Sequence, residues 1–297
     1  MRFGIDIGGT KIEAIALDDS GVEVMRERVP TPTADYPSLL EAVRDLVVSF
    51  ESQLGAEATV GVGHPGVISP ATGQIKNSNS QALLGQALDH DLAAILDRPV
   101  RLANDADCFA LSEATDGAGA GFATVFGVIL GTGVGGGVVV SGRLVHGPNA
   151  IAGEWGHNPL PPSAAGPVEL LDCYCGRAGC IERYLSGPGI SADHLAMTGI
   201  ATTAAHISAA AQVGEPDAVA TLDRYVERLA AGLAVVINVL DPAVIVLGGG
   251  VSNIQALYEQ VPERWDRYVF SDRVDTQLAQ NLHGDSSGVR GAAWLWD

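Results

Sequence analysis

Three of the four cysteines in the sequence stand close together in the segment CYCGRAGC, at Cys173, Cys175 and Cys180. Thiols spaced this tightly suit a metal ion better than a disulfide, which needs about 5.5 Å between Cα atoms and a specific torsion. Two glycines in the segment let the chain curl so that three thiolates face one centre. His157 is the nearest candidate for the fourth ligand of a tetrahedral zinc ion. Three unrelated buried thiols are the alternative, since free cysteine is a common core residue.

Two carboxylates, Glu154 and Glu182, flank this predicted zinc site in the sequence. One belongs to the segment GEWGH and the other follows the last cysteine directly, and both could face a ligand. Their position on either side of the cysteine cluster suggests that the metal shapes a binding site rather than only the fold.

Three glycine-rich turns follow apolar segments, where backbone N–H groups could approach an anion without obstruction by side chains. They are residues 6–11 (DIGGTK), 130–137 (LGTGVGGG) and 248–250 (GGG). In the first turn, Thr10 adds a hydroxyl and Lys11 a charge, while Asp6 could hold Mg²⁺ through water because hard cations prefer oxygen ligands. A tight hairpin with a polar tip is the alternative for that turn. Three such turns suggest one extended polyphosphate ligand held from two lobes.

Asn104 and Asp105 stand at a predicted junction between a strand and a helix, where a carboxylate is presented rather than buried. Either residue could cap the helix, which is a common structural role. Asp105 could also accept a proton from a substrate hydroxyl, as phosphoryl transfer requires of a positioned acceptor. Both roles can hold together, with Asn104 capping the helix or binding substrate.

Alternating strands and helices must position these residues. The first unit reads as a strand, a glycine turn and two more strands, then helices and short strands, over residues 3–29, 38–54, 59–63, 88–96, 100–102 and 104–117. Residues 67–90 read as a loop. A second unit from about Thr124 repeats the plan of strand, glycine turn, strand, short turn and strand. Helices are expected over 187–239 and from about 252 and 288, with a strand at 244–247 between them.

The chain length of 297 residues favours two lobes over a single core. We expect a small lobe over residues 1–117, a larger lobe with the zinc site over 118–287, and a final helix, 288–297, that returns to the first lobe. No apolar run reaches the roughly 18 residues of a membrane span, and no secretory signal is evident. The clustered cysteines fit a reducing, cytoplasmic compartment. The net charge of −18 argues against a nucleic-acid partner.

The motifs DIGGTK, LANDADC, ILGTGVGGG, GEWGH, CYCGRAGCIE and VLGGG together resemble those of ROK-family sugar kinases. The resemblance runs from residue 3 to the terminal GDSSGVRGAAWLW, and GEWGHNPLP, KNSNS and HGDSSGVRGAAWLW point to the bacterial fructokinase/mannokinase branch. It implies an α/β fold of two lobes with a cleft between them, the actin-like ATPase (ribonuclease H-like) fold. The family's regulatory branch carries a DNA-binding helix-turn-helix before the first glycine motif, which begins here at residue 4, so we do not expect a repressor.

The resemblance also assigns roles to individual residues. Asp105 matches the general base. The residues that match the ATP site are Asp6, Gly8, Gly9, Thr10, Lys11, Gly131, Thr132, Gly133, Gly135, Gly248, Gly249 and Gly250. The residues that match the sugar site are Asn79, Asn104, Asp105, Glu154, His157 and Glu182. The zinc ligands are His157, Cys173, Cys175 and Cys180. The second nitrogen of a zinc-bound His157 would be held toward a sugar hydroxyl.

The implied reaction is ATP-dependent phosphorylation of the 6-hydroxyl of fructose, with mannose or glucose as further substrates. Mg²⁺ and a structural zinc ion are the implied cofactors, and a homodimer is expected. An N-acetylglucosamine kinase or glucokinase of the same family is the first alternative, and a non-catalytic sugar sensor is the second. His64 stands where many relatives have an apolar residue, either without consequence or with an effect on the sugar pocket. Loss of zinc is expected to impair sugar binding before ATP binding.

Overall fold

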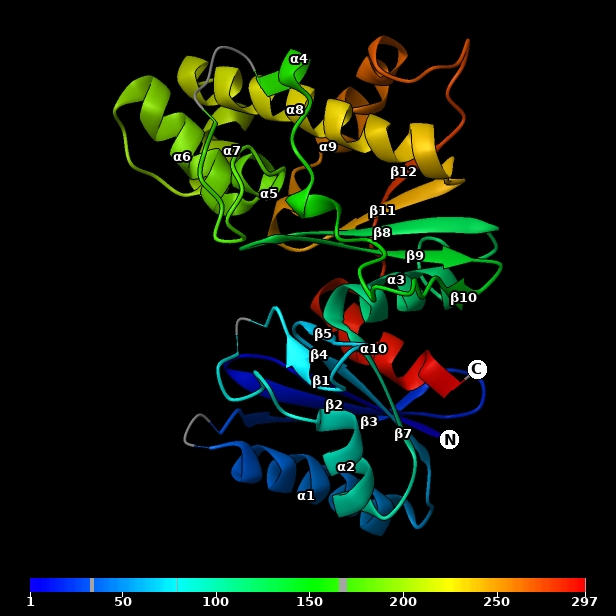
Figure 1. Cartoon of the computed structure of the whole chain (residues 1–297). Helices are drawn as coiled ribbons and strands as arrows, with labels where there is room; N and C mark the ends of the chain where they lie inside the picture. Colours follow the sequence, from blue (N-terminus) through cyan, green and yellow to red (C-terminus); the bar gives the residue numbers. More distant parts are fainter. Residues whose placement is uncertain (33–34, 79, 166–169, 297) are drawn as a thin grey trace.

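Two five-stranded sheets organise the chain, and the computed structural model describes residues 1–32, 35–78, 80–165 and 170–296 (Figure 1). The first sheet has the order β3-β2-β1-β4-β7. Its strands β1, β2 and β3 are antiparallel, whereas β4 and β7 run parallel to β1. Their bounds are Arg2–Ile7 (β1), Lys11–Leu17 (β2), Glu23–Pro30 (β3), Thr59–His64 (β4) and Val100–Asn104 (β7).

The second sheet repeats this plan in the order β10-β9-β8-β11-β12. Strand β8 is antiparallel to β9 and parallel to β11. In the same way, β1 is antiparallel to β2 and parallel to β4. The internal repeat that the sequence predicted is therefore present. The bounds are Thr124–Leu130 (β8), Val134–Val140 (β9), Arg143–Leu144 (β10), Val244–Gly248 (β11) and Gln277–Gln280 (β12). The predicted loop at 67–90 contains a small hairpin, β5 (Val67–Ile68) with β6 (Ile75–Lys76).

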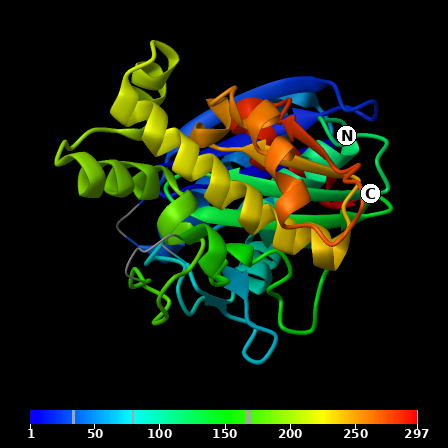
Figure 2. The ribbon, with the colours of Figure 1, turned by 90° about the horizontal axis from the view of Figure 1, so that it is seen from above.

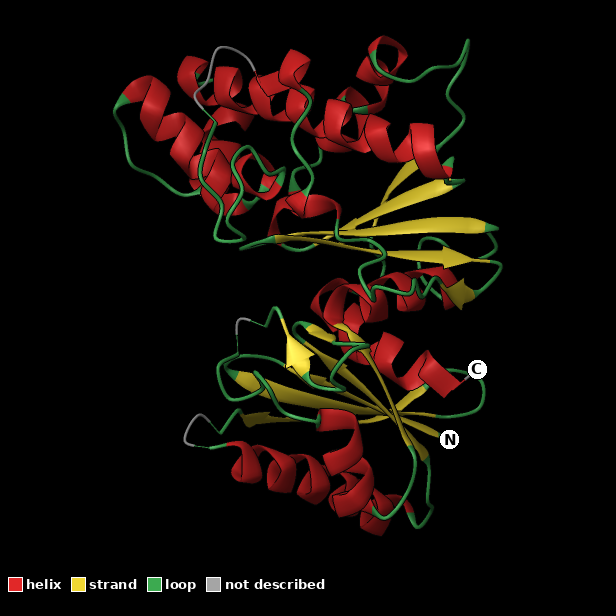
Figure 3. Ribbon diagram, in the orientation of Figure 1, coloured by secondary structure: helices red, strands yellow, loops and turns green. Residues whose placement is uncertain are grey.

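Helices cover the outer face of each sheet, as Figure 3 shows. On the first sheet these are α1 (Tyr36–Leu54) and α2 (Leu88–Leu96). Helix α1 buries an apolar stripe that includes Leu39, Val43 and Phe50, and it ends at Gly55 in a left-handed conformation. On the second sheet the long helix α8 (Pro216–Leu240) crosses the strands (Figure 2), beside α5 (Glu182–Leu185), α6 (Gly187–Thr198), α7 (Ala204–Gln212) and α9 (Leu257–Gln260). The remaining helical segments are α4 (Pro162–Ala165) and the 3₁₀ turns η1 (Trp155–His157), η2 (Gly250–Asn253), η3 (Pro262–Arg267), η4 (Gly284–Ser286) and η5 (Trp294–Trp296).

Two helices, α3 (Asp105–Thr115) and α10 (Ser287–Ala293), lie between the sheets (Figure 1). Glycines make this close packing possible. A Cβ atom on Gly137 of β9 would lie 2.8 Å from the side chain of Ala110 of α3, and one on Gly61 of β4 would lie 1.9 Å from the Ala292 carbonyl of α10. Helix α3 thus follows the first sheet in sequence and rests on the second. Helix α10, from the other end of the chain, rests on the first.

The α/β class and the two-lobe arrangement agree with the sequence prediction, and a lobe boundary at residue 117 remains a proposal. One predicted element is wrong. No α-helix begins near Ser252, because the chain makes only the 3₁₀ turn η2 there before α9. None of the helices in the described ranges combines the length and the apolar character needed to cross a bilayer.

Candidate active site

The four predicted zinc ligands converge. The ligand atoms of His157, Cys173, Cys175 and Cys180 all lie within 4.8 Å of one another. The His157 Nδ1 atom is 3.7 Å from the Cys173 Sγ atom, and the sulfurs of Cys175 and Cys180 are 3.6 Å apart. Zinc bonds of about 2.3 Å to sulfur and 2.0–2.1 Å to nitrogen give tetrahedral edges of about 3.5–3.8 Å. The residues therefore fit a structural zinc ion with all four positions filled by protein.

The second nitrogen of His157 is not vacant in this conformation. Its Nε2 atom lies 3.0 Å from the hydroxyl of Tyr174, whose ring meets the imidazole edge-on. Tyr174 is 80% exposed, so its ring can leave without loss of a core contact. The expected contact between Nε2 and a sugar hydroxyl requires this exchange of partners.

The segment GEWGH lies directly against β9. A Cβ atom on Gly153 or on Gly156 would lie 2.2 Å from a carbonyl oxygen of β9, so both positions require glycine. The Trp155 indole donates to the Gly135 carbonyl at 3.0 Å. Glu154 is held by these contacts at the edge of the second sheet. Asn79, also predicted to bind sugar, lies outside the described residues.

Asp105 opens helix α3, as the sequence predicted. The Ala106 backbone N–H donates to the Asn104 side-chain oxygen at 2.8 Å and to the Asp105 carboxylate at 2.9 Å. The Asn104 amide also donates to the Gly66 carbonyl at 2.9 Å, which joins the helix cap to the turn after β4. The Asp105 side chain is open to solvent, yet the walls around it desolvate the carboxylate and raise its pKa, and the charge of Glu154 raises it further. Asp105 and Glu154 are therefore close enough for their charges to interact.

Asp6, at the end of β1, belongs to the same group of acids. Burial raises its pKa to about 7, with further increases from the charges of Asp105 and Glu13 and a decrease from Lys11. A carboxylate that is costly to ionise alone is one that a divalent cation would stabilise. Lys11, expected at the phosphates, pairs here with Glu13 at 3.2 Å.

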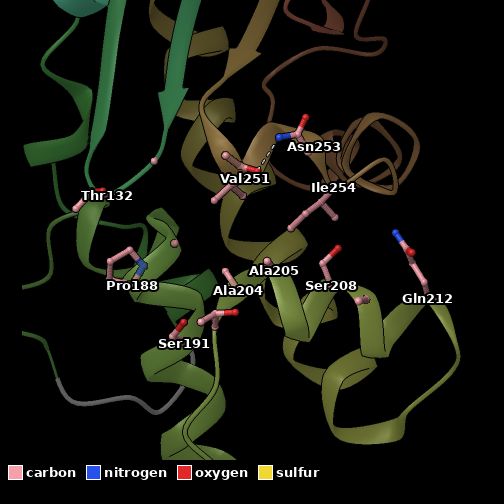
Figure 4. A pocket seen from close by; sticks show the side chains of 15 residues that line it. Thr132, Pro188, Ser191, Ala204, Ala205, Ser208, Gln212, Val251, Asn253 and Ile254 are labelled. Atoms are coloured by element: carbon pink, nitrogen blue, oxygen red, sulfur yellow. Dashed lines mark hydrogen bonds between the residues drawn. The ribbon is translucent and has the colours of Figure 1, made fainter. Parts of the chain in front are cut away.

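A cavity of about 730 Å³ opens beside the second glycine turn (Figure 4). Gly131, Thr132 and Gly250, which the sequence assigned to ATP, line one side of it. Helices α6 and α7 supply the other side, with Pro188, Ser191, Ala204, Ala205, Ser208 and Gln212. Neither helix was expected here, since small apolar and hydroxyl side chains on a helix carry no signal for a ligand. The volume suits a nucleoside with its first phosphates.

Most of the other glycines assigned to ATP are required by packing or by backbone conformation in this structure. A Cβ atom on Gly248 would lie 2.3 Å from the Phe109 ring, and one on Gly135 would lie 3.1 Å from the side chain of Ala106. Gly249 has a φ of 81° that favours glycine. Gly8 closes the β1–β2 hairpin by donating to the Lys11 carbonyl at 3.0 Å, whereas Gly9 has open space above its Cα atom.

A second cavity, of about 140 Å³, lies between the turn after β4 and the loop that precedes Gly153. Asn104, Asp107 and His64 line it. Burial lowers the pKa of His64 to about 4, so this side chain is neutral near pH 7. The pKa of Asp107 is raised to about 7, mainly by burial and further by the charges of Glu154 and Asp105. The Oδ1 atom of Asp107 has no hydrogen-bond partner among the described residues. Asp107 was not among the residues expected at the site. It lies in the first turn of α3, in the same LANDADC segment as Asp105.

The nucleotide role of the larger cavity can be tested by filling it. Replacing Ala205 with tryptophan should raise the KM for ATP about tenfold, because the indole would occupy space that the base requires, and should change the KM for sugar less than about threefold. Val213→Trp is the matched control, since Val213 follows α7, is 85% exposed and does not line the cavity. Equal ATP KM values for both variants would contradict the assignment.

The chain is similar to known proteins in both sequence and structure. A sequence model of the ROK family matches residues 2–297. The chain is 40% identical over 299 residues to an N-acetyl-D-glucosamine kinase of Yersinia pseudotuberculosis, covering 99% of this chain and 98% of that protein. A ROK hexokinase from Thermus thermophilus superposes with a TM-score of 0.88 at 30% identity, over 98% of this chain and 96% of that one.

A ROK-family glucokinase from Streptomyces griseus, solved in complex with glucose and AMPPNP, superposes with a TM-score of 0.77 at 28% identity. The alignment covers 99% of this chain and 98% of that one. These matches extend over 96–99% of each chain, so they include both sheets. The family expected from the sequence is confirmed: the chain belongs to the ROK family and has the two-lobe, actin-like ATPase fold of its sugar kinases.

Proposed function

We propose that this chain is a kinase that transfers the γ-phosphoryl group of ATP to the 6-hydroxyl of a hexose. The observation that carries the proposal is the position of Asp105. Its neighbour Ala106 contacts Gly135, at the start of the strand that follows the turn lining the 730 Å³ cavity. The charge of Glu154, which lies beside the zinc-binding residues in the sequence, raises the pKa of the Asp105 carboxyl. A base at this point can reach a sugar held by Glu154 and a phosphate held by the turn.

The proposed reaction assigns each residue a simple step. Asp105 accepts the proton of the sugar hydroxyl while the hydroxyl oxygen forms a bond to the γ-phosphorus. The bond from that phosphorus to the bridging oxygen breaks, and ADP leaves. Asp6 would hold Mg²⁺ through water, and the ion, when bound, neutralises charge on the phosphates. Closure of the lobes would exclude water and so limit hydrolysis of ATP.

N-acetylglucosamine is the acceptor that the relatives favour. The Yersinia relative, similar over its whole length, is named for that sugar. Fructose, which the resemblance placed first, is therefore the less well supported reading. It stays as the second candidate, with mannose or glucose, because of the segments GEWGHNPLP and KNSNS. The homodimer and the cytoplasmic location that the resemblance implies also remain predictions.

A panel of free sugars separates the two candidates. We expect kcat/KM for N-acetylglucosamine to exceed that for fructose, mannose and glucose by at least about tenfold, since a pocket built for an acetamido group loses contacts with a plain hydroxyl. Rates would be measured as ADP released at saturating ATP, with the phosphorylated position read by NMR. A clear preference for fructose or mannose would reverse the order of the candidates, and an absence of turnover with every hexose would contradict the kinase proposal.

A further inference from the structure

Glu182 contacts the nucleotide side of the site as well as the sugar side. Its Oε2 atom accepts a hydrogen bond of 3.0 Å from the backbone N–H of Val134, the first residue of β9. A Cβ atom on Gly133 would lie 2.6 Å from the same oxygen. The carboxylate therefore occupies the space above the turn, and a side chain at position 133 would displace it. Glycine at position 133 therefore leaves room for the Glu182 carboxylate to bond to the turn.

A second bond joins the same two segments. The Gly187 N–H, at the start of α6, donates to the Gly131 carbonyl at 2.8 Å. Residues 182–187 thus hold both ends of the turn 131–134, and Gly131 and Gly187 both line the 730 Å³ cavity. Movement of the turn away from α5 and the start of α6 would break both bonds.

The other end of this segment is fixed by the cysteine cluster. Cys180 stands two residues before Glu182, and its Sγ atom contacts the His157 carbonyl at 3.6 Å. The Ile181 N–H donates to the Asn158 carbonyl at 2.9 Å. Glu182 therefore lies between the cysteine cluster and the turn 131–134. Only its Oε2 atom contacts Val134 within the described residues, so Oε1 has the freedom to accept a sugar hydroxyl.

We propose that Glu182 is a positioning residue for the nucleotide, and that through it the sugar site and the ATP site are coupled. This inference rests on the proposed kinase function. With one carboxylate oxygen on the turn and the other on the sugar, a bound sugar fixes the glutamate and thereby the turn that receives the phosphates. Each substrate then tightens binding of the other by the same factor, as linkage requires.

The test measures the Kd of a non-hydrolysable ATP analogue with Mg²⁺ by calorimetry, without any sugar present. Glu182→Ala should raise this Kd about 5- to 50-fold, because a charge-assisted bond to the turn is lost. Glu182→Gln keeps an oxygen that can accept from Val134, and should hold the Kd within about threefold of wild type. Glu259→Ala is the control, since this exposed carboxylate on α9 does not line the 730 Å³ cavity. It should leave the sugar-free Kd unchanged.

Two results would overturn the inference. One is a sugar-free Kd for Glu182→Ala equal to that of the wild-type protein. The other is an equal weakening by Glu182→Gln and Glu182→Ala, since the amide variant retains the acceptor. The inference and the proposed function fail separately. A wild-type protein that phosphorylates no hexose removes the kinase proposal, while the nucleotide Kd still reports on the turn.

Discussion

Replacing Asp105 with asparagine is expected to lower kcat by about 10²–10⁴-fold, the usual contribution of a general base. The variant should still bind sugar and nucleotide. Helix α3 should persist, because the Ala106 N–H bonds to the Asn104 side chain at 2.8 Å and an asparagine oxygen at position 105 can replace the carboxylate. Turnover and calorimetric sugar binding would be measured on the same preparations. Sugar binding without turnover in the wild type would instead favour the sensor alternative.

The pH dependence of kcat/KM provides a second test of Asp105 as the base. Burial and the charge of Glu154 raise the pKa of Asp105, and only its ionised form can accept a proton. Wild-type kcat/KM should therefore fall as the pH is lowered through this raised pKa and stay level above it. The residual rate of the asparagine variant should not follow that acid limb.

Asp107→Asn is the matched control for both measurements. Asp107 lies on the same helix and lines the smaller cavity beside Asn104, and the charges of Glu154 and Asp105 act on it as well. Its replacement should lower kcat much less than Asp105→Asn does, because only Asp105 is proposed to accept the proton. If Asp107→Asn abolished turnover while Asp105→Asn did not, the base would have been assigned to the wrong carboxylate.

Replacing Cys180 with serine should remove the bound metal and lower the Tm by on the order of 10 °C, since a ligand that binds only the folded state stabilises it. Elemental analysis should find about one zinc per wild-type chain and almost none in the variant. Cys108→Ser is the control. Cys108 is fully buried elsewhere, against α10, so its loss disturbs packing but leaves the zinc content intact.

The structure also changes what loss of zinc should do to binding. The sequence alone led us to expect weaker sugar binding first and weaker ATP binding later. Because residues 182–187 hold the turn 131–134, we now expect Cys180→Ser to weaken both together. A metal-free protein with wild-type Tm and full activity would contradict the zinc assignment itself.

Most of the fold could be predicted from the sequence because its signals are local. Strand alternation before and after each glycine turn located β1, β2, β8 and β9, and the apolar spacing of helix α1 gave its C-terminal end at Leu54. Strand β12 was missed because Gln277–Gln280 lacks the apolar face of a buried strand. Its position depends on pairing with β11, a partner that is distant in sequence.

The part of the site whose residues are close in sequence could be predicted from their spacing. The part that depends on contacts between distant segments could be predicted less well. The cysteine cluster converges as its spacing indicated. The glycine turns are ambiguous in the sequence, since a glycine leaves room for a ligand and for a neighbouring protein atom alike. At Gly248 that atom belongs to the Phe109 ring, and at Gly133 it belongs to Glu182. Sequence can locate such a position but cannot say which group fills the space.

The placement of α10 on the first sheet has a consequence for how the protein is made. The inner face of β1 and β4 is covered by α10, which follows the strands of both sheets in the sequence, and Gly61 lies against the Ala292 carbonyl. Domains generally fold as units from the N-terminus during synthesis. Here the apolar face of the first lobe stays uncovered until α10 has been made, so this lobe is completed only after the strands of the second sheet have been synthesised. The Trp296 indole, which donates to the Val60 carbonyl at 2.7 Å, is among the last groups to close it.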